Sequence, residues 1–116
     1  MSVRQRALAR FEEAIRETED VFVSRHRDRD EYLAALESGL RESLCEPIEL
    51  TAEVTEPGLA DTEVGSPISG ICIAEANGYW LIYSPDRDAF LIFWGMNKDN
   101  LQAPGIEGSP LACWSA

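Results

Sequence analysis

The apolar positions of this chain follow a helical period first and a strand period afterwards. From Ser2 to about Ser24 apolar residues recur at steps of three and four, and charged residues fill most of the positions between them. That spacing places the apolar side chains on one face of a long helix. The segment Arg25–Asp30 has no apolar residue, so we expect it to connect this helix to a second one.

The second predicted helix begins at Asp28. Asp28 and Glu31 have the spacing of a capping box, with Asp in place of the usual Ser or Thr. The helix should end at Cys45-Glu46-Pro47, because a residue that precedes proline avoids helical dihedrals. Its buried face is expected to consist of leucines at positions 33, 36, 40 and 44. With a short connection, the two helices are expected to form an antiparallel hairpin.

From Pro47 the period changes to two. Ile48, Leu50, Ala52 and Val54 alternate with polar residues, which predicts a strand with one face in water. Glu56-Pro57-Gly58 stops this strand, and 59–67 reads as a loop that crosses to the next one.

The strongest strand signals follow between residues 68 and 95. Ile68–Ala76 resumes the sheet, with Gly70 expected at a bulge or a close approach. Asn77-Gly78 favours a two-residue turn with positive φ at both positions. The segments 79–83 and 90–94 are rich in aromatic and β-branched residues and are joined by the polar turn 84–88. Three strands therefore form a predicted meander.

The remaining residues predict less structure. Residues 97–100 are polar and 104–110 are rich in Gly and Pro, which indicates a long loop; whether the apolar tail Leu111–Trp114 adds an edge strand stays open. The sequence thus predicts one α+β domain over residues 1–116. An N-terminal antiparallel helix hairpin (1–46) packs on one face of a four- to five-stranded, mainly antiparallel sheet (47–116).

Both faces of this predicted sheet are apolar. Tyr79, Leu81 and Tyr83 alternate with Trp80 and Ile82, and the following strand is apolar on both sides as well. Two helices cover only one face of such a sheet. Either the loops and the tail cover the second face, or that face lies against another protein.

The charge of the chain restricts its partners. Ten Lys and Arg against 21 Asp and Glu give a net charge of −11, which disfavours binding to nucleic acids and anionic membranes. Residues 47–116 contain two basic and ten acidic groups, a net charge of −8. Within 46–63 there is no basic residue, and six acids are the candidate partner-binding residues: Glu46, Glu49, Glu53, Glu56, Asp61 and Glu63. Outward carboxylates on an edge strand also deter aggregation, so this reading stays open beside the binding one.

No residue set in the sequence predicts catalysis, a metal site or a cofactor. His26 is the only histidine and lies between two arginines in the expected connection. Cys45, Cys72 and Cys113 are too widely spaced for a compact zinc site and are expected to be reduced, buried thiols. Asp86 and Asp88 are expected to form the hairpin turn. We therefore expect a non-enzymatic protein, and we expect it in the cytoplasm because neither a signal core nor a stretch of membrane-spanning length is present.

The aromatic hairpin from Gly78 through Asp88 to Gly95, on a small acidic chain, resembles the strands of bacterial immunity proteins from polymorphic and contact-dependent toxin systems. This resemblance implies an inhibitor that binds a cationic toxin domain acting in the cytoplasm, with carboxylates in place of the toxin's anionic substrate. Two alternatives remain at this point. One is a secretion or assembly chaperone, or a homodimeric adaptor, that uses the apolar second face; the other is an enzyme with a pocket lined by Tyr79, Tyr83, Trp94 and acids.

Overall fold

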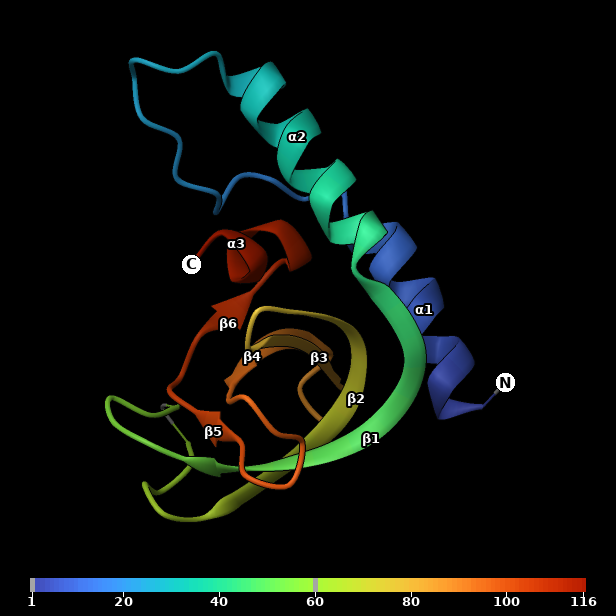
Figure 1. Ribbon diagram of the computed structural model, residues 1–116, viewed down its shortest axis with the longest axis vertical. Coiled ribbons are helices and arrows are strands. Elements are labelled where there is room, and N and C mark those ends of the chain that lie inside the picture. Colours follow the sequence, from blue (N-terminus) through green and yellow to red (C-terminus); the bar gives the residue numbers. More distant parts are fainter. Residues whose placement is uncertain (1, 60) are drawn as a thin grey trace.

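The structure of the protein, a computed structural model, describes residues 2–59 and 61–116 (Figure 1). Two helices come first in the chain, α1 (Val3–Ala14) and α2 (Arg29–Glu42). Four long strands follow, β1 (Leu44–Val54), β2 (Pro67–Ala76), β3 (Tyr79–Ser84) and β4 (Ala89–Trp94). The chain then adds two short strands, β5 (Gln102–Ala103) and β6 (Glu107–Gly108), and a last helix, α3 (Pro110–Ser115).

The sheet closes on itself. Strands β1 to β4 pair antiparallel in chain order, which includes the expected meander of β2, β3 and β4. Strand β5 then pairs with β1 in parallel and with β4 antiparallel, so the ring of strands is complete, and β6 extends β4. The parallel pair makes the sheet mixed. Figure 1 shows β1 and β2 curving around the other strands, as closure of so small a sheet requires.

Because the sheet is closed, both of its faces are covered by the chain. Ile82, Leu91 and Phe93 lie inside the barrel, where they pack with residues of β1, β2 and the segment 101–103. The opposite face of the same strands, which includes Leu81, Tyr83 and other residues of β2 to β4, packs under the three helices. The second face is therefore covered by the chain itself, through the curvature of β1 and the addition of β5.

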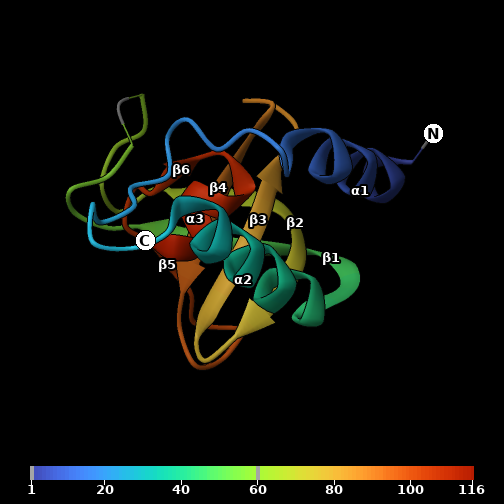
Figure 2. The ribbon, with the colours of Figure 1, turned by 90° about the horizontal axis from the view of Figure 1, so that it is seen from above.

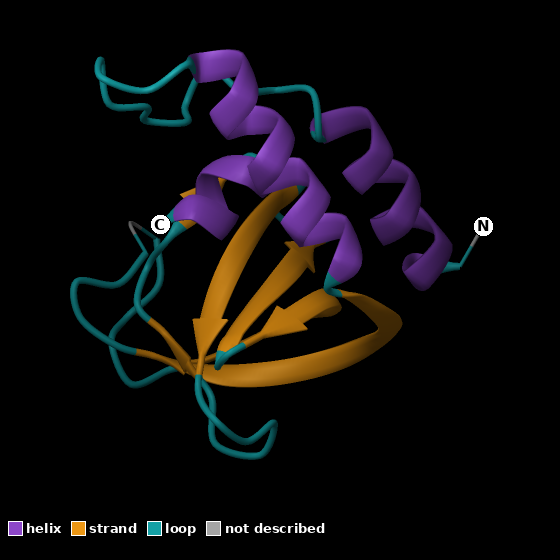
Figure 3. Ribbon diagram, turned by 45° about the horizontal axis from the view of Figure 1, so that its top comes forward, coloured by secondary structure: helices purple, strands orange, loops and turns teal. Residues whose placement is uncertain are grey.

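All three helices lie on one side of the strands. Figure 3 shows the helices above the strands, and in Figure 2, seen from above, α2 crosses over the sheet while α1 lies to one side. The residues they contribute to the core include Phe11 of α1, Leu40 of α2 and Leu111 of α3, each at most 1% exposed. The coarse prediction of an α+β domain is thus confirmed.

The first helix is shorter than its apolar period predicted. It ends at Ala14. The helical period put Phe22 on the buried face, but Phe22 is 85% exposed and its neighbour Val21 is buried. β-branched residues at 18, 21 and 23 are weak helix formers. Farther along, the carboxylate of Asp20 accepts hydrogen bonds from the backbone N–H and the hydroxyl of Ser109 at 3.0 and 2.6 Å. These bonds link the segment after α1 to the start of α3.

The tight helix hairpin is not confirmed. Residues 15–28 separate α1 from α2, and a direct link between the helices comes from Arg41, which donates to both carboxylate oxygens of Glu12 at 3.0 and 2.9 Å. Asp28 caps α2 as expected, accepting from the backbone N–H of Glu31 at 2.9 Å. The helix ends at Glu42, before the predicted position, because Leu44 already pairs with Ala74 of β2.

Two glycines occupy the positions that the pattern assigned to them. Asn77 and Gly78 have φ of 54° and 85°, as the predicted two-residue turn requires. Gly70 is a close approach, since a Cβ there would lie 2.8 Å from the carbonyl oxygen of Tyr83 and against the side chain of Ile82.

The sequence left open whether the apolar tail adds an edge strand, and the structure shows a helix there. Ser109 is its N-cap and accepts from the backbone N–H of Ala112, while Pro110 occupies the first helical positions. Both residue types favour a helix start, so the signal was present in the sequence. The preceding segment, expected to be only loop, contains β5 and β6.

Candidate functional site

The outer face of β1 carries exposed carboxylates. Glu49, Thr51 and Glu53 are exposed and alternate with buried Leu50, Ala52 and Val54, as the sequence period predicted. Ile48, which the same period placed on the buried side, is 38% exposed. Thr51 lies beside Ser69 of β2, with 2.6 Å between their hydroxyl oxygens. We call the residues Glu49, Thr51 and Glu53 the acidic strand face.

The six candidate acids do not form one cluster. All six are exposed, but Glu46 and Glu53 lie on the same strand seven positions apart, which is about 23 Å at the usual rise of a strand. Glu56 and Glu63 lie in the loop after β1. Ala60, in the same acidic segment, lies outside the described residues. The strand therefore spreads these charges along one side of the molecule.

Asp61 differs from the other five because it is paired. Arg87 of the β3–β4 turn donates to its carboxylate and to the hydroxyl of Thr62, and it also lies 3.5 Å from a carboxylate oxygen of Glu107. The hydrogen bond from Arg87 holds the pKa of Asp61 below its usual value. Among the described residues no ion pair engages Glu46, Glu49, Glu53, Glu56 or Glu63.

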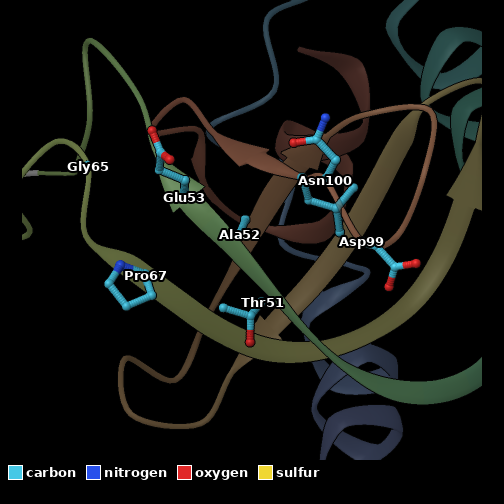
Figure 4. A pocket seen from close by; sticks show the side chains of 8 residues that line it. Thr51, Ala52, Glu53, Gly65, Pro67, Asp99 and Asn100 are labelled. Carbon is cyan, nitrogen blue, oxygen red and sulfur yellow. The ribbon is translucent and has the colours of Figure 1, made fainter.

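A groove of about 420 Å³ lies beside the acidic strand face. Thr51, Ala52 and Glu53 form its β1 side, Gly65 and Pro67 its second side, and Asp99, Asn100 and Leu101 its third. Figure 4 shows the carboxylates of Glu53 and Asp99 at opposite sides of this groove, directed away from each other. This arrangement offers acceptor oxygens for a ligand but does not bring two carboxyl groups onto one reacting atom.

Sequence reasoning missed Asp99 and Asn100 as members of the site. The run 97–100 reads as a polar loop, and nothing in it says which strand it folds beside. The parallel pairing of Glu53 with Gln102 decides this, because it draws the loop before β5 against the end of β1.

A second exposed feature is the aromatic end of the β3–β4 ladder. Tyr79 and Trp94 are cross-strand partners with ring centroids 6.1 Å apart, and they are 36% and 37% exposed. Met96, just beyond β4, is 87% exposed. Tyr83, which the alternative enzyme reading placed beside Tyr79 and Trp94, is fully buried, and its hydroxyl donates to Asp88 at 2.7 Å.

The other candidate residues for chemistry lie apart. His26 is exposed before α2. Cys72 and Cys113 are buried, while Cys45, expected to be buried, is exposed because it belongs to the start of β1 and not to a helix end. Desolvation raises the pKa of all three thiols, that of Cys72 and Cys113 to about 12. In residues 2–59 and 61–116 no three His, Cys, Asp or Glu side chains gather as a metal ion would require.

Within the described part of the chain, no helix has the length and apolar character needed to cross a bilayer. Comparison with protein-family models, with curated proteins and with solved structures finds no match to this chain. The surface of the molecule itself is therefore the basis on which a function can be inferred.

Proposed function

We propose that this protein is an inhibitor that binds a cationic protein partner in the cytoplasm, in the manner of small acidic immunity proteins that neutralise a toxin domain. The observation that carries the proposal is the acidic strand face, where Glu49 and Glu53 project from one strand with no cation paired to either among the described residues. Carboxylates held in this way substitute for the anionic substrate of a nuclease-like partner.

Electrostatics supports this choice over a solubility role alone. Residues 47–116 contain two basic groups, Arg87 and Lys98, and Arg87 is already engaged by Asp61 and Glu107. The sheet half thus presents nearly uncompensated negative charge. A surface of one sign attracts an oppositely charged partner and raises its association rate, an effect that salt screens beyond about 10 Å at 0.1 M.

The fold weakens the main alternative. A chaperone or adaptor that used the apolar second face would need Ile82, Leu91 and Phe93 open to a partner, and these side chains are at most 1% exposed inside the barrel. The acidic outer surface remains available for binding, whereas the feature that motivated the alternative is occupied by the chain.

A matched pair of baits tests the proposal. The wild-type protein and the double variant Glu49→Lys/Glu53→Lys are immobilised and exposed to an extract of the cells that produce the protein. Both side chains are exposed, so the variant should unfold at the same urea concentration as wild type. We expect the wild type alone to retain a basic protein, whose toxicity on expression is relieved by co-expression of the wild type.

The kinetics of the recovered pair complete the test. The association rate constant should fall as salt rises for the wild type and should be lower and less sensitive to salt for the double variant. Capture of the same protein by both baits, with equal rate constants and equal salt slopes, would show that the acidic strand face does not bind the partner.

A further inference from the structure

Glu53 of the acidic strand face and the aromatic end of the hairpin belong to one row of cross-strand partners around the barrel. Pro67 pairs with Glu53, Glu53 with Gln102, Gln102 with Trp94, and Trp94 with Tyr79, on five successive strands. All five residues are exposed. Because the strands form a closed ring, the row follows the circumference of the barrel, and only close neighbours in it face the same side. We call Glu53, Gln102 and Trp94, on three adjacent strands, the belt; at about 4.8 Å for each strand it spans about 10 Å along the outside of the barrel.

The belt places an aromatic ring near carboxylates that form no ion pair with any residue the structure describes. Glu53 and Trp94 are separated by one strand, with the neutral side chain of Gln102 between them. The surface is hollowed on both sides of Asn100, which lines the groove that holds Glu53 and Asp99 and a second groove, of about 330 Å³, that holds Trp94 and Met96.

This combination selects the chemistry of the partner. An exposed indole face attracts a cation, and a planar guanidinium stacks on it better than a compact ammonium does. The carboxylates of Glu53 and Asp99 add charge that an arginine satisfies and an acidic or neutral side chain does not. A second copy of this chain brings the same net charge of −11 to the contact, so self-association is opposed by repulsion.

We propose that the belt of Glu53, Gln102 and Trp94 is the centre of the interface, and that it receives an arginine side chain of the partner over Gln102, stacked on Trp94 and paired with Glu53. This inference rests on the proposed function and specifies its contact. The acidic strand face beyond Glu53 then forms a polar rim that steers association, while the aromatic pair supplies the desolvated anchor typical of interface centres.

The test compares nona-arginine with nona-lysine, two peptides of equal charge, by fluorescence anisotropy of dye-labelled peptide with the full chain. We expect the wild type to bind nona-arginine more tightly. Trp94→Ala should weaken nona-arginine binding by roughly 3- to 10-fold and remove the preference for arginine. Glu53→Gln and Gln102→Lys should each weaken the binding of both peptides. Because Gln102 is exposed, the Gln102→Lys variant should fold, and it keeps the test valid if Trp94→Ala does not fold.

Two variants outside the belt serve as controls. Phe22→Ala removes an apolar side chain that is 85% exposed, and Glu13→Gln removes an exposed carboxylate of α1. Neither should change the affinity or the arginine preference. Equal weakening by Glu13→Gln and Glu53→Gln would mean that net charge alone attracts the peptides, and would overturn the belt together with the proposed site.

The remaining outcomes separate the inference from the proposed function. If Trp94→Ala keeps the arginine preference while Glu49→Lys/Glu53→Lys abolishes binding, the belt is wrong and the acidic strand face binds by itself. Absence of binding of either peptide to the wild type contradicts both. A dimer in sedimentation velocity that Trp94→Ala dissociates would show that the belt is a contact between copies of this chain, which also overturns the inference.

Discussion

Replacement of Leu91 by alanine tests the closure of the barrel directly. Leu91 is 1% exposed and faces the interior opposite Ile82, whereas in an open sheet with helices on one side it would face water. The substitution removes three carbon atoms, which is about 2.4 kcal/mol of transfer free energy at about 0.8 kcal/mol for each. A residual cavity of up to about 80 Å³ would add as much as about 2 kcal/mol. We expect the free energy of unfolding to fall by about 2.5 to 4.5 kcal/mol.

Urea denaturation followed by circular dichroism and by tryptophan fluorescence measures this loss, provided that the two probes give one transition with an unchanged slope. Val64→Ala is the matched control, because Val64 is 53% exposed in the loop before β2 and should cost less than about 0.5 kcal/mol. A loss below about 1 kcal/mol for Leu91→Ala would refute the closed barrel, since that is the result expected of a leucine on a solvated sheet face.

Three further predictions concern the helices, the C-terminal helix start and the thiols. Leu40→Ala should lower the free energy of unfolding by about 2 to 5 kcal/mol in the same assay, because Leu40 is fully buried on the face of α2 that packs on the sheet. A loss well under about 1 kcal/mol would show that α2 does not pack there. Burial alone would raise the pKa of Asp20, but its hydrogen bonds from Ser109 lower it overall, so the stabilisation is present above the unfolded pKa and is lost as the pH falls through the folded one. Acid titration of stability should therefore show a steeper loss below about pH 4 in wild type than in Asp20→Asn, and parallel curves would contradict this role. Mass spectrometry after native alkylation at alkaline pH should find Cys45 modified and the two buried cysteines protected, and an intramolecular disulfide would overturn the assignment of free thiols.

Local patterns in the sequence determined the elements whose formation depends on neighbouring residues. Asn77-Gly78 encodes the turn because both positions adopt positive φ, and Asp28 encodes the start of α2 through a hydrogen bond to a backbone N–H three residues on. Alternation along the second half of β1 likewise predicted that Glu49 and Glu53 face water, although it also predicted a buried Ile48, which is exposed.

The tertiary structure decided how these elements close and which surface residues become neighbours. The pairing of Gln102 with Glu53 and with Trp94 joins residues almost fifty positions apart through a two-residue strand, too short to leave a period in the sequence. The path of the chain after α1 likewise involves a distant residue, because Ser109 donates hydrogen bonds to Asp20. The sequence by itself therefore determined an acidic α+β domain with an outward acidic strand. Only long-range pairing, which local propensity does not encode, buried the second sheet face and left a single strand, β5, between Trp94 and that acidic strand.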